Sequence, residues 1–320
     1  MRHSDKVTLK SGISLPLMGI GTATFGGMYT PIQLRDAEMV VDEAIKLDIP
    51  YFDTAPHYGK GVSETRLGSA LKKYPRDSYV ISTKVGRILV PALDADDSDF
   101  KDADSSVERI FDFSASGVER SLKDSLERLG KDFVEIVFIH DPDDYPDQAI
   151  AEAYPALAKM REQGIIKNIG VGMNQPEIPT RFVKETDIDI VLIAGRYTLL
   201  DQSAQRELIP AALSRGVHVV AAGVFNSGIL ANPVAGAHYD YAPASPQILA
   251  RAQAIATFLK ERDIAIERAA LQFPLRNPGI KSLLVGCRSA EEVRKNTEFF
   301  NDPVPESIWE ELEALMSKQS

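Results

Sequence analysis

The sequence predicts an α/β protein, a (β/α)₈ TIM barrel that forms a single domain over residues 1–320. Short apolar runs that are typical of buried strands alternate with stretches of helical period along the whole chain. No composition break divides these units. Because eight apolar runs can be counted, a closed barrel is favoured over an open doubly wound sheet.

The expected strands are eight apolar runs: residues 17–22, 49–52, 79–83, 134–139, 165–171, 188–194, 217–222 and 282–285. Residues 37–45 repeat apolar positions at the spacing of one helix face. Ser116 and Glu119 are expected to form a capping box at the start of the following helix, which Gly130 is placed to end. Helix and strand therefore alternate on both sides of residue 130.

Four segments lie outside this repeat. Residues 7–15 read as a β-hairpin with its turn at Ser11-Gly12, which we expect to close the barrel floor. An extra C-terminal helix is expected around residues 308–316, and residues 223–246 form a second long connection. Residues 86–114 form a long loop rich in aspartate, which is either a wall of the active site or a disordered segment.

Charge and composition narrow the class of partner. The net charge is -10 and the isoelectric point is about 5.1, which disfavours nucleic acid and anionic membrane surfaces. No apolar run approaches the roughly 20 residues that span a bilayer, and the first residues lack the apolar core of a signal peptide. Cys287 is the only cysteine, expected to be a packed small residue. We expect a cytoplasmic enzyme with a small-molecule substrate, and the oligomeric state stays open.

Four ionisable residues follow expected strands. Asp53, Tyr58, Lys84 and His140 each come after an apolar run. In a parallel barrel the carboxyl ends of all strands open on one face, where catalytic groups collect. The four side chains are therefore predicted to form one catalytic site.

The motifs around these residues resemble those of the aldo-keto reductase family. They are Asp-Thr-Ala-Pro-His-Tyr-Gly at residues 53–59, Ser-Thr-Lys at 82–84, Ile-His at 139–140 and Gly-Val-Gly-Met-Asn at 170–174, and the likeness runs from about Met18 to Asn296. The resemblance implies a (β/α)₈ barrel and a nicotinamide dinucleotide bound without a Gly-x-Gly-x-x-Gly loop. No such loop occurs in the sequence.

The chemistry of the four residue types agrees with the family roles. Tyr58 would be the acid/base, and the Lys84 ammonium is expected to lower the pKa of its phenol from about 10. Asp53 would keep Lys84 charged and oriented. His140 would hydrogen-bond the reacting oxygen, while hydride transfer belongs to the cofactor.

Two nearby groups of residues are expected to have structural rather than chemical roles. His140 with Asp141, Asp143 and Asp144 has the residue types of a metal site, but adjacent residues at a strand end point in different directions, so no metal is expected. Glu64 is expected to be a carboxylate at a helix start rather than a catalyst.

The resemblance also implies the cofactor contacts, with Asn174 on the nicotinamide carboxamide. The expected contacts are Gly21, Thr22, Asp53, Asn174, Phe225, Asn226, Ser227, Gly228, Gly286, Arg288, Glu292 and Asn296. Three positions depart from the family pattern: Met173 replaces a frequent serine, Ala194 a frequent glutamine, and Ala222 an aromatic residue that stacks on the nicotinamide. Either Phe225 compensates for that aromatic residue or the stack is absent.

NAD is expected rather than NADP. Gly286 stands where relatives that prefer NADP often carry lysine, and Glu292 where they often carry arginine or glutamine. A carboxylate would repel a ribose phosphate and accept hydrogen bonds from a free ribose. Arg288 argues the other way, since a guanidinium can pair with a phosphate.

The likeness is greatest to a subgroup that includes L-fucose and D-threo-aldose 1-dehydrogenases, L-galactose dehydrogenase and pyridoxal 4-dehydrogenase. That resemblance implies an NAD(P)-dependent oxidoreductase, most simply a dehydrogenase that oxidises an aldose or a cyclic hemiacetal to a lactone. Two alternatives stay open: an NADPH-dependent aldehyde or ketone reductase, and a cofactor-binding regulatory subunit with little turnover.

Overall fold

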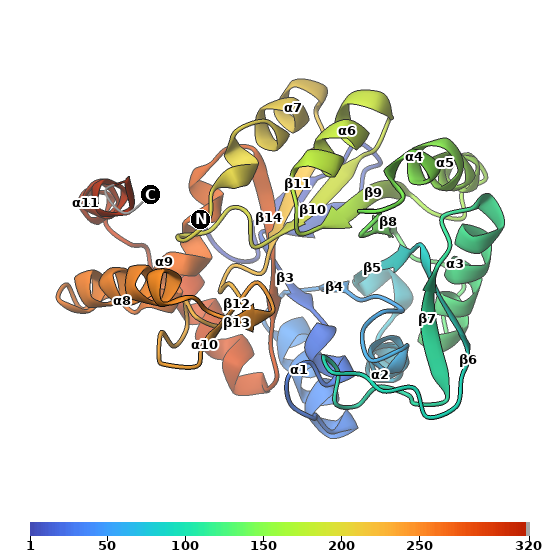
Figure 1. The fold of residues 1–320 in the computed structure, drawn as a ribbon, viewed down its shortest axis with the longest axis horizontal. Coiled ribbons are helices and arrows are strands. Elements are labelled where there is room, and N and C mark those ends of the chain that lie inside the picture. Colours follow the sequence, from blue (N-terminus) through green and yellow to red (C-terminus); the bar gives the residue numbers. More distant parts are fainter. Residues whose placement is uncertain (318–320) are drawn as a thin grey trace.

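The computed structural model describes residues 1–317, and they form a closed barrel of parallel strands surrounded by helices (Figure 1). The barrel strands follow one another in chain order around the ring, and the last pairs with the first. They are β3 (Met18–Gly21), β4 (Tyr51–Asp53), β5 (Val80–Val85), β8 (Ile136–His140), β9 (Asn168–Met173), β10 (Ile190–Ala194), β11 (His218–Ala222) and β14 (Ile280–Gly286). The predicted (β/α)₈ barrel is confirmed.

Helices cover the outside of the ring (Figure 1). They are α1 (Leu34–Lys46), α2 (Val62–Ala70), α3 (Ala115–Leu129), α4 (Pro146–Gln148), α5 (Tyr154–Glu162), α6 (Glu177–Glu185), α7 (Leu208–Arg215), α8 (Pro246–Lys260), α9 (Ile266–Gln272), α10 (Ala290–Asn301) and α11 (Glu306–Ser317). In α1 the buried side chains include Val40, Val41 and Ala44, which is the apolar face expected from the sequence. The expected C-terminal helix is α11, which packs against α8 away from the barrel. No helix within residues 1–317 has both the length and the apolar character needed to cross a membrane.

A hairpin closes one end of the barrel, as predicted. Its strands β1 (Lys6–Thr8) and β2 (Ser14–Pro16) pair antiparallel, and Gly12 in the turn takes a φ of 86°, which favours glycine. Leu9 and Leu15 are buried in one cluster with barrel side chains. These barrel side chains are Tyr51, Ile136, Phe138, Ile190, Leu192, Val220 and Leu284. The hairpin therefore fills the barrel floor and leaves the opposite end open.

The start of α3 differs from the prediction. The N-cap is Ser114, whose hydroxyl accepts a 3.0 Å hydrogen bond from the backbone N–H of Gly117. The capping box expected from Ser116 and Glu119 was therefore wrong, since Ser116 already lies inside the helix. Gly130 ends the helix with a φ of 61°, as expected.

Two long connections at the open end carry their own hairpins. β6 (Arg87–Pro91) pairs antiparallel with β7 (Val107–Phe111), and an isolated bridge joins Phe100, in the aspartate-rich loop between them, to Met28. Within residues 223–246, β12 (His238–Tyr239) pairs with β13 (Ala242–Pro243). Both connections lie beside the barrel mouth (Figure 1).

Candidate active site

The barrel brings together the four residues predicted to form a site. Asp53 ends β4, Lys84 lies near the end of β5, and His140 ends β8. Tyr58 follows β4 in a turn, where its backbone N–H donates to the carbonyl of Ala55 at 3.1 Å. Parallel pairing of neighbouring strands puts these ends on one face.

Lys84 is the centre of the cluster. Its side chain is 1% exposed, and Nζ donates to Asp53 Oδ2 at 2.6 Å, to the Thr54 carbonyl at 2.9 Å and to the Tyr58 hydroxyl at 3.0 Å. The other carboxylate oxygen of Asp53 accepts from Ser82 Oγ at 2.7 Å. All three ammonium protons therefore have acceptors, and the ion pair is held in one orientation.

Burial controls the protonation of this cluster. Burial is the largest single influence on the pKa of Lys84 and opposes its charge, but Asp53 and the Tyr58 oxygen together outweigh it and hold that pKa above its ordinary value. Burial raises the pKa of Tyr58 above 10, against the lowering effect of Lys84. The expected influence of Lys84 is present. The expectation that it leaves the pKa of Tyr58 below the ordinary value was wrong, because desolvation of the phenolate is the larger effect.

His140 lies beside the phenol. The rings of Tyr58 and His140 meet edge to face with centroids 6.0 Å apart. Burial, together with the nearby charges of Arg87 and Lys84, holds the pKa of His140 well below 6.5, so this imidazole is neutral. Its Nδ1 is buried and has no hydrogen-bond partner within residues 1–317, and Nε2 lies 3.4 Å from Asp141 Oδ2. A neutral imidazole here can donate one hydrogen bond to a reacting oxygen.

A cavity of about 350 Å³ opens above the four residues. Its lining comes from strand ends and from the loops over the mouth: Met28, Tyr29, His57, Tyr58, Lys84, Arg87, Asp99, Phe100, His140, Asp141, Gly172, Met173, Asn174, Leu192, Ala194 and Tyr241. Asp99 and Phe100 belong to the aspartate-rich loop. Of the two readings of this loop, the structure therefore supports a wall of the site.

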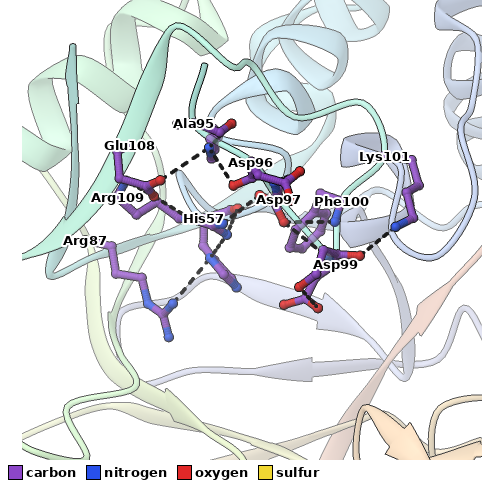
Figure 2. Close-up of polar contacts among 12 residues, drawn as sticks. His57, Arg87, Ala95, Asp96, Asp97, Asp99, Phe100, Lys101, Glu108 and Arg109 are labelled. Carbon is purple, nitrogen blue, oxygen red and sulfur yellow. Dashed lines mark hydrogen bonds and ion pairs between the residues drawn. The ribbon is translucent and has the colours of Figure 1, made fainter. Parts of the chain in front are cut away.

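Ion pairs and a histidine fix this wall (Figure 2). Arg87 donates to Asp141 at 2.6 Å, and Arg109 donates to Asp97 at 2.6 Å. Nδ1 of His57 lies 3.3 Å from Arg87 Nη1 and 2.7 Å from Arg109 Nη1. The wall is thus joined by side chains both to the segment that carries Tyr58 and to the residue after His140.

Several of these wall residues were not predicted. The position of Arg87 could have been inferred from the sequence, since it follows Lys84 closely on the same chain segment. Asp141 was considered only as a metal ligand. Tyr241 enters the cavity from the β12–β13 turn with a φ of 64°, and nothing in the sequence pattern indicates that position.

The predicted cofactor residues divide into three groups. In the first, Asn174 lines the cavity, and Gly21 pairs with Gly286 at the ends of β3 and β14. Thr22 is fully buried, and its hydroxyl is hydrogen-bonded to the Asp53 carbonyl at 2.9 Å and to Ser63 Oγ at 2.8 Å. The hydroxyl of Thr22 is therefore used in hydrogen bonds at the end of β4, beside Asp53.

The second group, Phe225 to Gly228, follows β11. Phe225 packs partly buried against the main core and is not among the residues that line the cavity. Asn226 donates to the Gly195 carbonyl at 3.2 Å, while its buried Oδ1 has no partner within residues 1–317. Ser227 Oγ accepts from the Tyr241 backbone at 3.1 Å. This segment therefore links the end of β10 to the β12–β13 hairpin.

The third group surrounds the start of α10. The guanidinium of Arg288 donates to the carbonyls of Met28, Thr30 and Pro31 at 2.8–3.0 Å. Glu292 is exposed and accepts a 2.8 Å bond from the Arg288 backbone N–H. The amide of Asn296 is buried against Cys287 Sγ at 3.5 Å. Arg288 is therefore engaged with the loop after β3.

The expected positions of two other residues, Glu64 at a helix start and Cys287 in the packed interior, are confirmed. Glu64 is fully buried in the first turn of α2, where it accepts 2.6 Å bonds from Thr83 Oγ1 and Arg128 Nε. Cys287 is 1% exposed, and burial raises the pKa of its thiol to about 12. Across residues 1–317, no group of three or more histidine, cysteine or acidic side chains is arranged to hold a metal ion.

Comparison with known proteins identifies the family to which this barrel belongs. Residues 17–317 match the model of the aldo/keto reductase family. The chain is 38% identical to D-threo-aldose 1-dehydrogenase from Pseudomonas sp, over 98% of this chain and 97% of that protein. It is 36% identical to pyridoxal 4-dehydrogenase from Microbacterium luteolum over 99% of both. A holo aldo-keto reductase structure from Bacillus halodurans shares the fold, with a TM-score of 0.77 at 24% identity over 99% of this chain and 96% of that one. The chain therefore belongs to the aldo/keto reductase family of nicotinamide-dependent oxidoreductases.

Proposed function

We propose that this enzyme oxidises the anomeric hydroxyl of an aldose, or of a related cyclic hemiacetal such as that of pyridoxal, to a lactone with NAD as the hydride acceptor. The observation that carries the proposal is the Asp53–Lys84–Tyr58 chain of hydrogen bonds, which ends at the floor of a cavity that His140 also lines. It supplies a proton carrier and a neutral hydrogen-bond donor side by side.

Each of the four side chains has one task in this proposal. His140 donates a hydrogen bond to the substrate oxygen and fixes its position. Tyr58 accepts the hydroxyl proton as the C–O bond becomes a carbonyl. Lys84 stabilises the phenolate form of Tyr58 that accepts this proton, and Asp53 keeps Lys84 protonated and oriented. When bound, the nicotinamide ring supplies the chemistry that removes the hydride from the same carbon.

The residues present fit a nicotinamide dinucleotide. Asn174 lines the cavity that holds Tyr58, and the orphaned acceptor Asn226 Oδ1 suits a ligand that brings an N–H donor. A Cβ added at Gly228 would meet nothing within 4 Å, so the backbone there leaves open space. These residues, with Gly21 and Gly286, would hold the cofactor.

The proposed preference for NAD over NADP rests on Arg288 and Glu292, which lie around the start of α10. The three backbone carbonyls that accept from Arg288 compete with any phosphate for its guanidinium. Glu292 keeps an exposed carboxylate one turn into α10. Together they favour an unphosphorylated ribose.

The substrate class is supported by the cavity lining and by the relatives. Arg87, Asp99 and Asp141 give the wall both hydrogen-bond donors and acceptors, which suits a neutral molecule with several hydroxyl groups. The two relatives described above are named for an aldose and for pyridoxal. A cytoplasmic location remains a prediction that accompanies this proposal.

The test is a set of initial rates for a panel of aldoses and pyridoxal, with NAD and NADP in parallel, and for reduction of simple aldehydes with NADH and NADPH. Higher kcat/KM for an aldose or pyridoxal with NAD supports the proposal. Preferred reduction of aldehydes with NADPH would assign the carbonyl reductase instead. Cofactor binding without turnover of any substrate would assign the regulatory subunit.

A further inference from the structure

His57 lies on the cavity wall between two arginine side chains (Figure 2). Its Nδ1 is 2.7 Å from Arg109 Nη1 and 3.3 Å from Arg87 Nη1. The proposed proton chemistry of Tyr58, Lys84, Asp53 and His140 makes no use of this residue. Its contacts nevertheless decide which ring nitrogen carries a proton.

A guanidinium group only donates hydrogen bonds. Nδ1 of His57 therefore acts as the acceptor for both arginines and carries no proton. Burial, with the charges of Arg87, Arg109 and Lys84, lowers the pKa of His57 to about 2, so the ring is neutral throughout the working range of an enzyme. A neutral imidazole with a bare Nδ1 has its single proton on Nε2.

The Nε2–H group is available to a ligand. Within residues 1–317, Nε2 of His57 makes no hydrogen bond. It is also not one of the side-chain atoms that are both buried and unpartnered, so solvent can reach it. His57 lines the same cavity as Tyr58 and His140, and its ring centroid lies 5.7 Å from that of His140. The donor therefore faces the space beside the reacting centre.

The ring is also held rigidly. Arg109 is fixed by Asp97 at 2.6 Å, and Arg87 by Asp141 at 2.6 Å. Phe100 packs edge to face against the imidazole with centroids 5.2 Å apart. A donor whose direction is set before the substrate arrives loses little entropy on binding.

We propose that His57 is a substrate-binding and specificity-determining residue, whose Nε2–H donates a hydrogen bond to a substrate oxygen away from the carbon that is oxidised. Since that oxygen must be an acceptor, the substrate it selects is hydroxylated beyond its reacting group. For an aldose, which is the class taken from the proposed function, the acceptor is a ring hydroxyl.

A matched pair of variants separates this role from a structural one. His57→Asn keeps an oxygen near the Nδ1 position for the two arginines and removes the donor at the Nε2 position. His57→Gln reaches further and keeps an N–H donor near Nε2. Both are assayed for kcat/KM on the best aldose and on its monodeoxy analogues, and for cofactor affinity by fluorescence titration.

The expected result is selective. For the parent aldose, His57→Asn should lower kcat/KM by about three- to tenfold, mainly through KM, which is the range of one neutral hydrogen bond. For the analogue that lacks the acceptor hydroxyl, the same substitution should have almost no effect. His57→Gln should recover most of the loss, and cofactor affinity should stay unchanged in both.

An equal loss on the parent and on every analogue, with no recovery in His57→Gln, would overturn the assignment and leave His57 as a wall residue. Should His57→Asn not fold, Arg109→Met, which frees the ring, is compared on the same substrates. If the wild type reduces aldehydes rather than oxidising aldoses, the proposed function fails. The role of His57 is then decided by the ratio of glyceraldehyde to propanal turnover, which His57→Asn should lower.

Discussion

The Lys84 ammonium lies 3.0 Å from the hydroxyl of Tyr58, and its other two acceptors, Asp53 and Thr54, are buried. The contact has two consequences of opposite sign. The ammonium stabilises a phenolate, while the burial that makes the contact strong also disfavours that phenolate. The tyrosine is therefore protonated at neutral pH, and its ionisation depends on Lys84.

Tyr58→Phe should abolish turnover and leave cofactor binding nearly intact. The phenol carries the proton, and a general acid or base typically contributes about 10²–10⁴-fold to the rate. Single-turnover rates and a fluorescence titration with NAD measure the two effects. A variant that keeps more than about a tenth of wild-type kcat would assign the proton transfer to another group.

Lys84→Met should move the pH profile of oxidation to higher pH. Oxidation needs the Tyr58 phenolate, so its rate should rise with pH toward the raised pKa of Tyr58. Removal of Lys84 removes the lowering contribution and raises that pKa further. The measurement is kcat/KM against pH for both enzymes, with circular dichroism to check the fold. An unchanged alkaline limb would show that the two groups are not coupled.

Glu292→Gln should narrow the preference for NAD mainly by improving NADP. The substitution removes a charge and keeps the shape, and an exposed charge of this kind is worth about two- to fivefold in affinity. Adding Gly286→Lys should narrow the preference further by supplying a partner for a phosphate. The ratio of kcat/KM for the two cofactors is compared in the three enzymes at one ionic strength. A wild type that prefers NADP contradicts the assignment and shifts attention to Arg288.

Arg128→Met should destabilise the fold without changing the chemistry. Glu64 is fully buried, and its Oε2 accepts from Arg128 Nε at 2.6 Å, so loss of the arginine leaves a buried carboxylate with only Thr83 as partner. Breaking a buried ion pair in this way typically costs about 3–5 kcal/mol. Thermal and urea unfolding measure the loss. Below the melting range, kcat per folded molecule should match the wild type, and a large fall in kcat would mean that Glu64 takes part in catalysis.

The fold could be predicted well because its main signals are local. Each barrel strand contains a short apolar run, and Asp53, Lys84 and His140 come at or near the ends of such strands. The helix cap at Ser114 was missed because three serine and alanine positions in a row offer equivalent starts, and only the contact with Gly117 N–H decides between them. Periodicity carries no information of that kind.

The walls of the site could be predicted only in part. Arg109, which donates to Asp97, meets His57 because the β6–β7 hairpin folds back over the barrel mouth, and its register is set by tertiary contacts. Tyr241 reaches the cavity through a turn with positive φ. The direction of the Tyr58 pKa shift depends on the extent of burial, which no sequence pattern reports.

Closure of the barrel joins segments near the two ends of the chain. β14 pairs with β3 through Leu283 and Met18, and Arg288 bonds the loop after β3 on the same side. The ring can therefore close only after β14 has been synthesised, and such distant pairing makes folding slow. The expected cofactor contacts at Gly21 and Gly286 come together only in this last step. We expect partly synthesised chains to have no affinity for the dinucleotide, so that NAD stabilises the finished barrel alone.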